Sequence, residues 1–465
     1  MNKKSIVHFI GIGGIGVSAL ARYFLALGAK ISGSDAFSSE ITESLKKEGV
    51  EVKIGHKTGN ITSKIGLIIH SAAIASDNTE IQKARDLGVL IKSYSEVIGG
   101  LTKKYKTIAI SGSHGKSTTT ALLSLVLKNT SFDPTVIIGT KLKEFGNSNF
   151  KKGKSDYLVL EADEYQKSFL NYSPVAAIIT NIDREHLDVY KNLNEIKKVF
   201  LKFIGNIRFG GILVVNKDDK NLFGLRDKIQ KIIKKNNLRV FWYSIFPRQS
   251  ALSRRMSATL KVTGEHNLSN ALAVYTLTKV LGINQKKIFN AIGKYRGAWR
   301  RMEFRGQLKT KSCKLKADVY DDYAHHPTEI KATLSGVRQK YPKSKIICVF
   351  QPHQVKRLKA LFKEFTKAFD SADDLILLDI FKVAGRDPSI NSGLVPSTSN
   401  YSSQKLAEVI EKRKTSPSVF YLKNPKNLPK IIKNILNSKS YILNPVVVVM
   451  MGAGDIYKLT DKLIK

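Results

Sequence analysis

Residues 106–120 of the chain read KTIAISGSHGKSTTT, and the interpretation of the remaining sequence starts from this stretch. A short run rich in apolar residues leads into a turn that contains Gly112 and Gly115, and a helix is expected to begin near Lys116. Glycines allow the backbone to curl with its N–H groups pointing inward, which suits a bound phosphate. The pattern predicts a phosphate-binding loop, although Ile110 stands where the usual loop has its first glycine.

Two strands that follow this loop in the sequence are expected to end in polar residues. The apolar run of residues 157–160 leads to the acids within residues 161–164, and residues 176–180 lead to NIDREHLD at residues 181–188. In an open α/β sheet the carboxyl ends of parallel strands lie at one edge, where ligands bind. Because clustered carboxylates repel one another unless a cation lies nearby, the three strand ends predict a shared site for a nucleotide and a cation.

The N-terminal part contains a second glycine-rich turn. Residues 5–10 are expected to form a strand, GIGGIG follows at residues 11–16, and Asp35 lies at the end of the next strand. Strand, glycine-rich turn, helix and acid in this order predict that a nucleotide diphosphate binds at the helix N-terminus. Ser71 follows another buried strand, where α/β sheets also place ligand contacts.

The last third of the chain repeats this organisation. Apolar runs lead to DDYAHHPT at residues 321–328, to QPHQVKR at residues 351–357 and to GAGD at residues 452–455. We therefore predict an α/β protein of three domains, which is also the number expected at about 150 residues per domain. The predicted domains are an N-terminal Rossmann-like domain (1–103), a central domain with a P-loop ATPase-type sheet (104–299) and a C-terminal Rossmann-like domain (300–465).

Composition excludes several classes of protein. Cys313 and Cys348 are the only cysteines, so a disulfide framework and a cysteine-based zinc site are excluded. We find neither a signal peptide nor an apolar run of about 18 residues, and we expect a cytoplasmic protein without a membrane partner. The net charge of +39 comes mostly from lysines spread along the whole chain. This distribution favours solvated lysines and a general attraction for anionic small substrates over a specific nucleic-acid groove.

Taken together, these motifs resemble the Mur ligases of peptidoglycan synthesis, and the resemblance extends over essentially the whole chain. The matching segments are residues 11–16, 33–35, 112–120, 161–164, 181–188, 266–270, 300–301, 321–328 and 452–455. Mur ligases hold the UDP-sugar, ATP and the incoming amino acid on successive domains. The motifs are most similar to the branch that joins L-alanine to the lactyl carboxylate of UDP-N-acetylmuramate through an acyl phosphate. The resemblance therefore implies an ATP-dependent ligase that uses Mg²⁺ in cell-wall precursor synthesis.

The resemblance also implies a role for each matching residue. The residues expected to contact the UDP-sugar are Gly13, Gly14, Ile15, Asp35 and Ser71. Those expected to contact ATP are Gly112, Ser113, His114, Gly115, Lys116, Ser117, Thr118, His266, Asn270, Arg300 and Tyr323. Mg²⁺ would be held by Ser117, Glu161 and His186, and the amino acid by His325 and Arg357. The expected catalytic residues are Lys116, Glu161, His186 and His325, of which the two histidines are candidates for deprotonating the amine.

The sequence departs from the family at two places and leaves three alternatives open. Gln354 stands where the family usually has an arginine, so Arg357 is the remaining one of two cations expected to grip the amino-acid carboxylate. Residues 246–264 are shorter than in the family. The alternatives are a recycling ligase that joins peptides to the UDP-sugar, an NAD-dependent oxidoreductase and a nucleic-acid binder. We expect small-molecule substrates and a monomer or weak homodimer.

Overall fold

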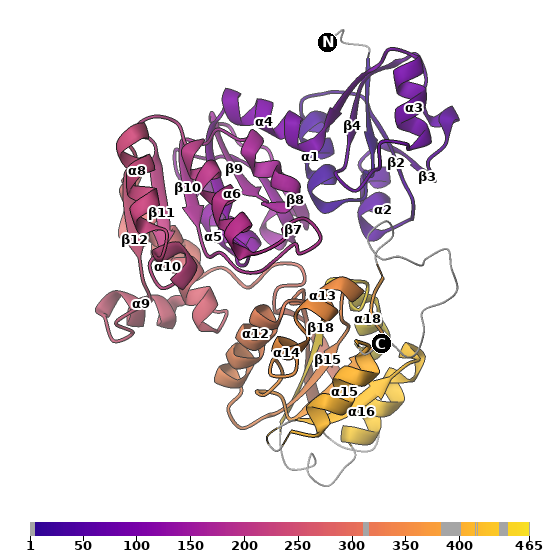
Figure 1. Ribbon diagram of the computed structural model, residues 1–465, viewed down its shortest axis with the longest axis vertical. Helices are drawn as coiled ribbons and strands as arrows, with labels where there is room; N and C mark the ends of the chain where they lie inside the picture. Colours follow the sequence, from indigo (N-terminus) through magenta and orange to yellow (C-terminus); the bar gives the residue numbers. More distant parts are fainter. Residues whose placement is uncertain are drawn as a thin grey trace. The chain divides into compact units, whose positions relative to one another are not determined.

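The computed structural model describes residues 5–309, 316–382, 401–413, 415, 417–436 and 445–464 (Figure 1). Three β-sheets follow one another along this part of the chain, and helices connect most of their strands. The predicted α/β class with three successive sheets is confirmed. Cys348 is buried as a free thiol, whereas Cys313 lies outside the described residues.

The first sheet is parallel and has the strand order β3-β2-β1-β4-β5. Its strands are β1 (Ile6–Ile10), β2 (Ile31–Asp35), β3 (Glu51–Ile54), β4 (Ile65–His70) and β5 (Leu90–Ser93). Its helices are α1 (Ile15–Ala26), α2 (Glu40–Lys47), α3 (Thr79–Asp86) and α4 (Tyr94–Lys104). The central strand β1 is almost continuously apolar because both of its faces are buried.

The second sheet has seven strands in the order β12-β11-β10-β6-β9-β7-β8. They are β6 (Lys106–Ser111), β7 (Thr135–Leu142), β8 (Ser148–Lys151), β9 (Tyr157–Ala162), β10 (Ala176–Ile179), β11 (Ile212–Asn216) and β12 (Arg239–Tyr243). The helices are α5 (Lys116–Lys128), α6 (Leu193–Gly205), α7 (Lys220–Phe223), α8 (Arg226–Asn236), α9 (Ala251–Thr259), α10 (Glu265–Val280) and α11 (Gln285–Ile292). Only β7 and β8 pair antiparallel among these strands, so the carboxyl ends of β10, β6 and β9 lie at one edge.

The third sheet has six strands in the order β13-β14-β18-β15-β16-β17. They are β13 (Glu303–Lys309), β14 (Lys316–Asp322), β15 (Lys345–Phe350), β16 (Asp374–Leu378), β17 (Ser418–Leu422) and β18 (Val446–Met451). The helices are α12 (Pro327–Lys340), α13 (Val355–Ala360), α14 (Phe362–Phe365), α15 (Ser403–Glu411), α16 (Leu428–Leu436) and α18 (Tyr457–Ile464). Alternate residues of the strands β14 to β18 enter or pack against two apolar clusters, one on each face. The edge strand β13 is antiparallel to β14, which departs from a purely parallel Rossmann-like sheet.

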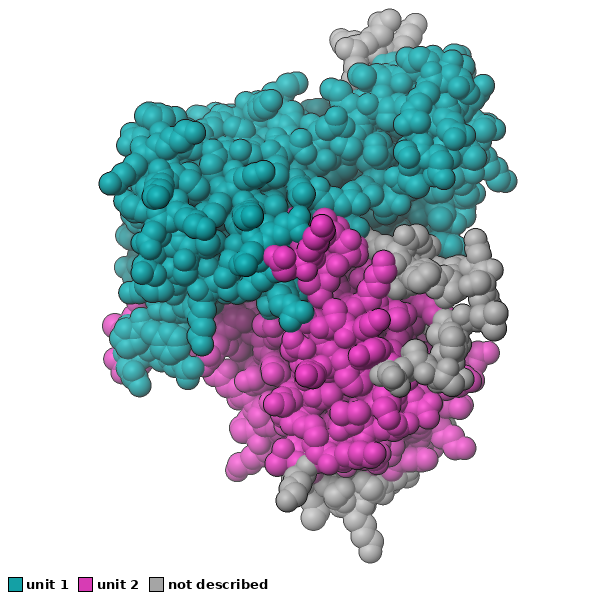
Figure 2. Space-filling model, viewed as in Figure 1, with its two compact units in different colours: residues 1–184, 193–250, 269–293 teal, residues 185–192, 251–268, 294–465 magenta. Residues whose placement is uncertain are grey.

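The contacts divide the chain into two compact units, which Figure 2 shows in different colours. One unit contains residues 1–184, 193–250 and 269–293, and the other contains residues 185–192, 251–268 and 294–465. Two short segments from the middle of the sequence therefore belong to the unit that carries the third sheet. The domain boundaries expected from the sequence stay predictions. No helix among the described residues is both long and apolar enough to cross a lipid bilayer.

Candidate active site

The glycine-rich turn after β1 lies against the ends of two neighbouring strands. The N–H of Gly13 donates a hydrogen bond to Oδ2 of Asp35 (2.8 Å), and a Cβ added to Gly13 would lie only 2.9 Å from that oxygen. A Cβ on Gly11 would lie 3.0 Å from Cβ of Ser71. Gly14 caps α1 without a side-chain hydrogen bond, and the first turn of α1, which starts at Ile15, has no acid. The residues predicted for the UDP-sugar thus lie together at a helix N-terminus suited to a diphosphate.

The phosphate loop, residues 112–115, requires glycine at both of its ends. Gly112 has φ +138°, and a Cβ there would lie 2.0 Å from Oγ1 of Thr180. Gly115 has φ +82°, and a Cβ there would lie 2.6 Å from Oδ1 of Asn270. Both positive φ values and both close approaches exclude larger residues. Asn270, a predicted ATP ligand, therefore lies against the loop.

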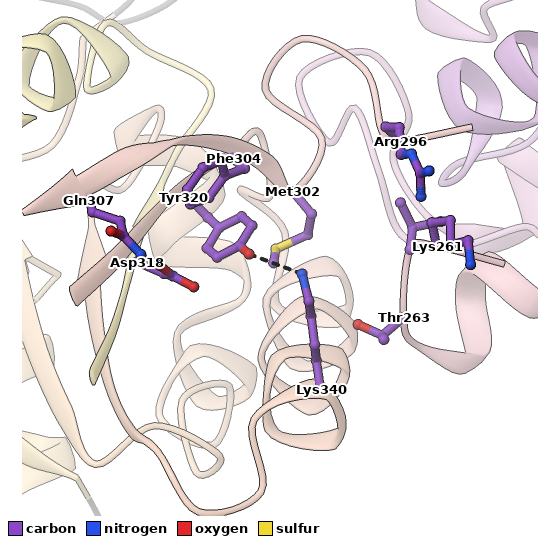
Figure 3. Close-up of a pocket in the computed structure, with 10 residues that line it drawn as sticks. Lys261, Thr263, Arg296, Met302, Phe304, Gln307, Asp318, Tyr320 and Lys340 are labelled. Atoms are coloured by element: carbon purple, nitrogen blue, oxygen red, sulfur yellow. Dashed lines mark hydrogen bonds between the residues drawn. The ribbon is translucent and has the colours of Figure 1, made fainter. Parts of the chain in front are cut away.

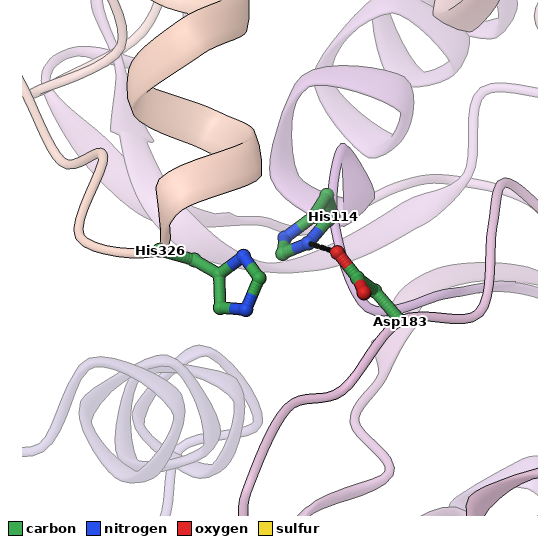
Figure 4. Close-up of side chains that lie close together, drawn as sticks. All are labelled: His114, Asp183 and His326. Carbon is green, nitrogen blue, oxygen red and sulfur yellow. Dashed lines mark hydrogen bonds and ion pairs between the residues drawn. The ribbon is translucent and has the colours of Figure 1, made fainter. Parts of the chain in front are cut away.

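The phosphate loop is held in place by hydrogen bonds to the residues that follow β10. The main-chain N–H of His114 donates to Oδ1 of Asn181 (2.8 Å), and the amide of Asn181 donates to the His114 carbonyl (3.0 Å). Nε2 of His114 also lies 3.0 Å from Oδ2 of Asp183, an ion pair drawn in Figure 4. Ser113 Oγ accepts a hydrogen bond from the Asp183 main chain (2.8 Å). The loop after β6 and the segment after β10 are thus joined by hydrogen bonds, as expected for strand ends that share one edge of the sheet.

Lys116 points from the start of α5 into the acids at the end of β9. Its Nζ donates to the Gly112 carbonyl (2.7 Å) and to Oε2 of Glu164 (2.8 Å), and it lies 3.6 Å from Oδ1 of Asp163. Burial lowers the pKa of Lys116, but the charges of Glu164 and Asp163 raise it more strongly, so the ammonium stays protonated. Sequence reasoning gave no individual role to Glu164, which is only 1% exposed. The signal was present, since Glu164 belongs to the cluster of acids after β9.

Ser117 and Glu161 place two oxygen atoms beside each other at the phosphate loop. Oγ of Ser117 donates to Oε2 of Glu161 (3.1 Å), and the main-chain N–H of Gly139 donates to Oε1 of Glu161 (2.6 Å). Mg²⁺ prefers oxygen ligands, so this hydroxyl–carboxylate pair fits the predicted ion. Thr118, which follows in α5, is buried. His186, the third predicted ligand, belongs to the other compact unit and offers a nitrogen.

The unit with the third sheet contains a second group of charged side chains, the acceptor cluster of Glu185, His325, His353 and Arg357. Nη2 of Arg357 lies 3.2 Å from Oε2 of Glu185, and Nη1 lies 3.2 Å from Nδ1 of His353. Glu185 is 4% exposed. Burial raises the pKa of this carboxyl, but Arg357 and the nearby histidines lower it more strongly, to well below its usual range. Glu185 is therefore ionised and paired with Arg357. Sequence reasoning missed this pair, because 172 residues separate its two members.

His325 is held by its own neighbours in the chain. Its Nδ1 lies 3.1 Å from Oε2 of Glu329, and the same nitrogen lies 3.1 Å from the Tyr323 carbonyl. Its ring centroid lies 5.9 Å from that of His353. The structure therefore brings both predicted amino-acid ligands, His325 and Arg357, together through the ring of His353.

Arg300, predicted to contact ATP, is buried and donates to the main chain. Its guanidinium reaches the carbonyls of Gly452, Ala453 and Gly454, and it lies over the Tyr323 ring with Cζ 4.8 Å from the centroid. The main-chain N–H of Tyr323 donates to the Arg300 carbonyl (2.7 Å). The arrangement fixes the position of Tyr323, and the contact of Arg300 with a nucleotide stays a prediction.

Three further positions have unusual environments. Burial lowers the pKa of His266 to about 4, so its imidazole is neutral at physiological pH. His186 has φ +54° and Gln354 has φ +70°, in the region that residues other than glycine seldom occupy. Nε2 of the buried Gln354 has no hydrogen-bond partner among the described residues. His186 and Gln354 both lie in segments that carry predicted ligands.

Comparison with sequence families identifies three successive matches along the chain. The Mur ligase family catalytic domain matches residues 6–106, the Mur ligase middle domain residues 110–278, and the Mur ligase glutamate ligase domain residues 300–454. Two similar proteins are the UDP-N-acetylmuramate–L-alanine ligases of Clostridium kluyveri and Clostridium botulinum, each 40% identical. The alignment with the first covers 99% of this chain and 97% of that protein, and the alignment with the second covers 100% and 98%.

Solved structures show the same fold. The UDP-N-acetylmuramate–alanine ligase of Thermotoga maritima is 27% identical, with a TM-score of 0.77 and 98% of both chains covered. A murein peptide ligase from Psychrobacter arcticus is 21% identical, with a TM-score of 0.68 over 99% of this chain and 98% of that chain. The fold is thus shared with solved proteins over nearly the full length.

Proposed function

Since the chain belongs to the Mur ligase family, we propose that it joins L-alanine to the lactyl carboxylate of UDP-N-acetylmuramate at the expense of ATP. The main support for this assignment is the 40% sequence identity to proteins named for that reaction. The alignments cover essentially the whole of this chain and of each relative. A peptide-recycling ligase, an NAD-dependent oxidoreductase and a nucleic-acid binder are not favoured by this similarity.

In the first step, a carboxylate oxygen of the sugar attacks the γ-phosphorus of ATP, and ADP leaves with the former bridging oxygen. The reaction brings two anions together, so positive charge must be fixed where they meet. Lys116, protonated and anchored to the Gly112 carbonyl, would neutralise the transferred phosphoryl group. Ser117 and Glu161 would hold Mg²⁺, which when bound supplies further charge at the phosphate oxygens. The product of this step is an acyl phosphate.

In the second step, the neutral amine of alanine attacks the acyl carbon, inorganic phosphate leaves and the nitrogen loses a proton. Arg357 would bind the carboxylate of alanine, because its guanidinium lies among histidines beside the ionised Glu185. His325, whose Nδ1 faces Glu329, is positioned to accept a proton through its ring, and His186 is the other candidate. His266 and Asn270 would contact the adenosine part of ATP, with Tyr323 beside it.

The test is an assay of ADP release with UDP-N-acetylmuramate, ATP and Mg²⁺, in which L-alanine, glycine, L-serine and a tripeptide are compared. We expect L-alanine to give the highest kcat/KM and a product whose mass equals the sugar plus alanine minus water. Stimulation by the tripeptide alone would overturn the assignment. Omission of Mg²⁺ should abolish turnover, because the phosphate loop supplies only one cation of its own.

The proposed substrates also suggest where the protein works and in what form. ATP and a UDP-sugar are substrates of the cytoplasm, so we place the reaction there. All the predicted ligands come from this one chain, which supports a functional monomer or weak homodimer. Sedimentation of the purified protein across a range of concentrations tests this proposal.

A further inference from the structure

A pocket of about 430 Å³ lies within the unit that carries the third sheet (Figure 3). Its walls come from the hairpin of β13 and β14, from the end of α12 and from the segments around residues 262 and 296. The lining residues are Lys261, Val262, Thr263, Arg296, Met302, Phe304, Gln307, Asp318, Tyr320 and Lys340. None of them is a predicted ligand of ATP, the UDP-sugar, Mg²⁺ or the amino acid.

The pocket and the acceptor cluster lie at opposite ends of the same helix. His326, next to His325, caps the first turn of α12, whereas Lys340 is its last residue. A helix of 14 residues is roughly 20 Å long at 1.5 Å per residue. A ligand of this pocket would therefore not occupy the acceptor cluster.

Three cations line the pocket, and none of them forms an ion pair with another described residue. Lys261 and Arg296 are exposed, and neither has an ion-pair partner within the described part of the chain. Nζ of Lys340 donates to the Tyr320 hydroxyl (2.9 Å), as Figure 3 shows, and lies 4.9 Å from the centroid of that ring. Like charges gathered around one hollow favour an anionic ligand.

The single acid of the lining does not neutralise these cations. Asp318 accepts hydrogen bonds from Nε2 of Gln307 (2.9 Å) and from the Tyr341 hydroxyl (3.1 Å). Its two oxygens thus accept from neutral donors, one in the lining and one from Tyr341 behind it. The charge left facing the hollow is positive, since three cations oppose one carboxylate.

One wall of the pocket is flat and apolar. Phe304 is 49% exposed, and its ring centroid lies 5.4 Å from that of the buried Tyr320. Met302 and Val262 extend the apolar surface. An aromatic group of a ligand could pack on the exposed face of Phe304, because aromatic rings attract one another in tilted and offset arrangements.

From this combination we infer that the pocket is a second ligand site, separate from the ligation reaction, for a small phosphate ester that carries a flat aromatic group. Lys261 and Arg296 bind the phosphate, and Phe304 packs against the ring. Arg296 adds a planar guanidinium, which can donate two parallel hydrogen bonds to phosphate oxygens. The inference rests on the pocket alone and does not depend on the proposed ligase activity.

Calorimetric titration of the full chain with phenyl phosphate tests the inference, with saturating ADP and Mg²⁺ present to fill the phosphate loop. We expect phenyl phosphate to bind more tightly than either inorganic phosphate or benzyl alcohol, because each of these carries only one of the two recognised groups. The double variant Lys261→Ala, Arg296→Ala should weaken binding by at least about tenfold, the loss expected for a charge-assisted hydrogen bond. Phe304→Ala should weaken phenyl phosphate by about fivefold and leave inorganic phosphate unchanged.

Lys286→Ala, Arg226→Ala is the matched control, since it removes one exposed lysine and one exposed arginine outside the pocket. This control should bind phenyl phosphate as the unmodified protein does. Absence of binding at millimolar phenyl phosphate would overturn the inference, as would equal weakening by the pocket and control variants. Binding of inorganic phosphate as tight as that of phenyl phosphate would overturn the aromatic part of it.

Discussion

The phosphate loop and the acceptor cluster each bury a cation against a glutamate, yet the groups around these two pairs differ. At the loop, Lys116 lies 2.8 Å from Glu164, and Asp163 and Glu161 add to the negative charge around it. In the acceptor cluster, Glu185 lies 3.2 Å from Arg357, and the charges of nearby histidines lower the pKa of Glu185 further.

This difference indicates what each region is suited to receive. Acids in excess of the single lysine leave the phosphate loop able to accept another cation, which agrees with a metal-bound nucleotide. In the acceptor cluster, Glu185 pairs with Arg357 and Glu329 pairs with His325, and the Arg357 guanidinium has further N–H donors for another anion, which agrees with the carboxylate of an amino acid. The two regions are therefore suited to ligands of different charge.

The largest effect is expected from Lys116→Ala, which removes the ammonium group beside Glu164 at the phosphate loop. Ligation should fall about 10³-fold or more, because the transferred phosphoryl group loses its fixed cation. Binding of UDP-N-acetylmuramate, measured by calorimetry, should persist, since its predicted ligands lie in the first sheet. Lys128→Ala, at the far end of α5, is the control and should retain turnover.

Lys116→Ala also leaves Glu164 buried without its lysine, so lost activity must be separated from lost stability. The double variant Lys116→Ala, Glu164→Gln removes the unpaired charge and should recover the melting temperature while ligation stays low. Turnover within tenfold of the unmodified protein in either variant would contradict the role of Lys116.

Glu185→Ala tests the acceptor cluster, because it leaves Arg357 buried without its carboxylate partner. The free energy of unfolding should fall by about 4 kcal/mol, the loss typical of a broken buried ion pair. Urea unfolding of the full chain measures the change. Adding Arg357→Leu should recover part of the loss, because the two residues act as a pair. A change below about 1 kcal/mol in Glu185→Ala would mean that water or other groups compensate the arginine.

Glu80, in the first sheet, sharpens the comparison because hydroxyl, amide and imidazole groups, and no lysine or arginine ion pair among the described residues, surround this third buried glutamate. Ser34 Oγ donates to its Oε2 (2.5 Å) and Asn60 donates to its Oε1 (2.5 Å), while ring nitrogens of His56 and His8 lie 3.3 Å and 3.9 Å from Oε2. Burial raises the pKa of Glu80, but His8 and these hydrogen bonds lower it from the ordinary 4.5 to about 2.

A lowered pKa contributes stability above the unfolded-state value, and this contribution is lost as pH falls from about 4.5 to about 2. The expected loss is about 3 kcal/mol for a shift of this size. Calorimetric melting between pH 7 and pH 2 should therefore show a steeper decline for the unmodified protein than for Glu80→Gln. Parallel declines would show that Glu80 does not carry the acid sensitivity.

The smallest effect is expected from Gln354→Arg, which adds a cation beside the acceptor cluster. KM for L-alanine should fall about threefold with kcat little changed, because a further charge-assisted contact strengthens binding of the carboxylate. Gln354→Glu is the matched control and should raise KM through repulsion. Equal KM values in both variants would place Gln354 outside the amino-acid site.

The phosphate loop could be predicted from the sequence because its geometry depends on adjacent residues. Gly112, Gly115, Lys116 and Ser117 lie within six positions, and positive φ values explain the two glycines. The three sheets could also be predicted, because apolar strands and strand-end motifs alternate with helical segments. The edge strand β13 was missed because its antiparallel pairing leaves no distinctive pattern.

The acceptor cluster could be predicted only in part. His325 and Arg357 were found through the family resemblance, but their dependence on Glu185 was not, because a contact across 172 residues leaves no local signal. The contacts of Arg300 could not be predicted from the sequence either. Its position in the motif was recognised, whereas its hydrogen bonds to the carbonyls of residues 452–454 depend on how the chain returns after β18.

The division of the chain between its two units has a consequence for how this enzyme can be cut or recombined. The polypeptide passes from one unit to the other after residues 184, 192, 250, 268 and 293, so no single cut releases either of them intact. A fragment that begins at residue 294 would contain Arg357 but not Glu185. A chimera that exchanges the whole chain after one of these junctions can take Glu185 from one parent and Arg357 from the other. Productive hybrids of this protein with a relative should therefore transfer residues 185–192 and 251–268 together with the C-terminal segment.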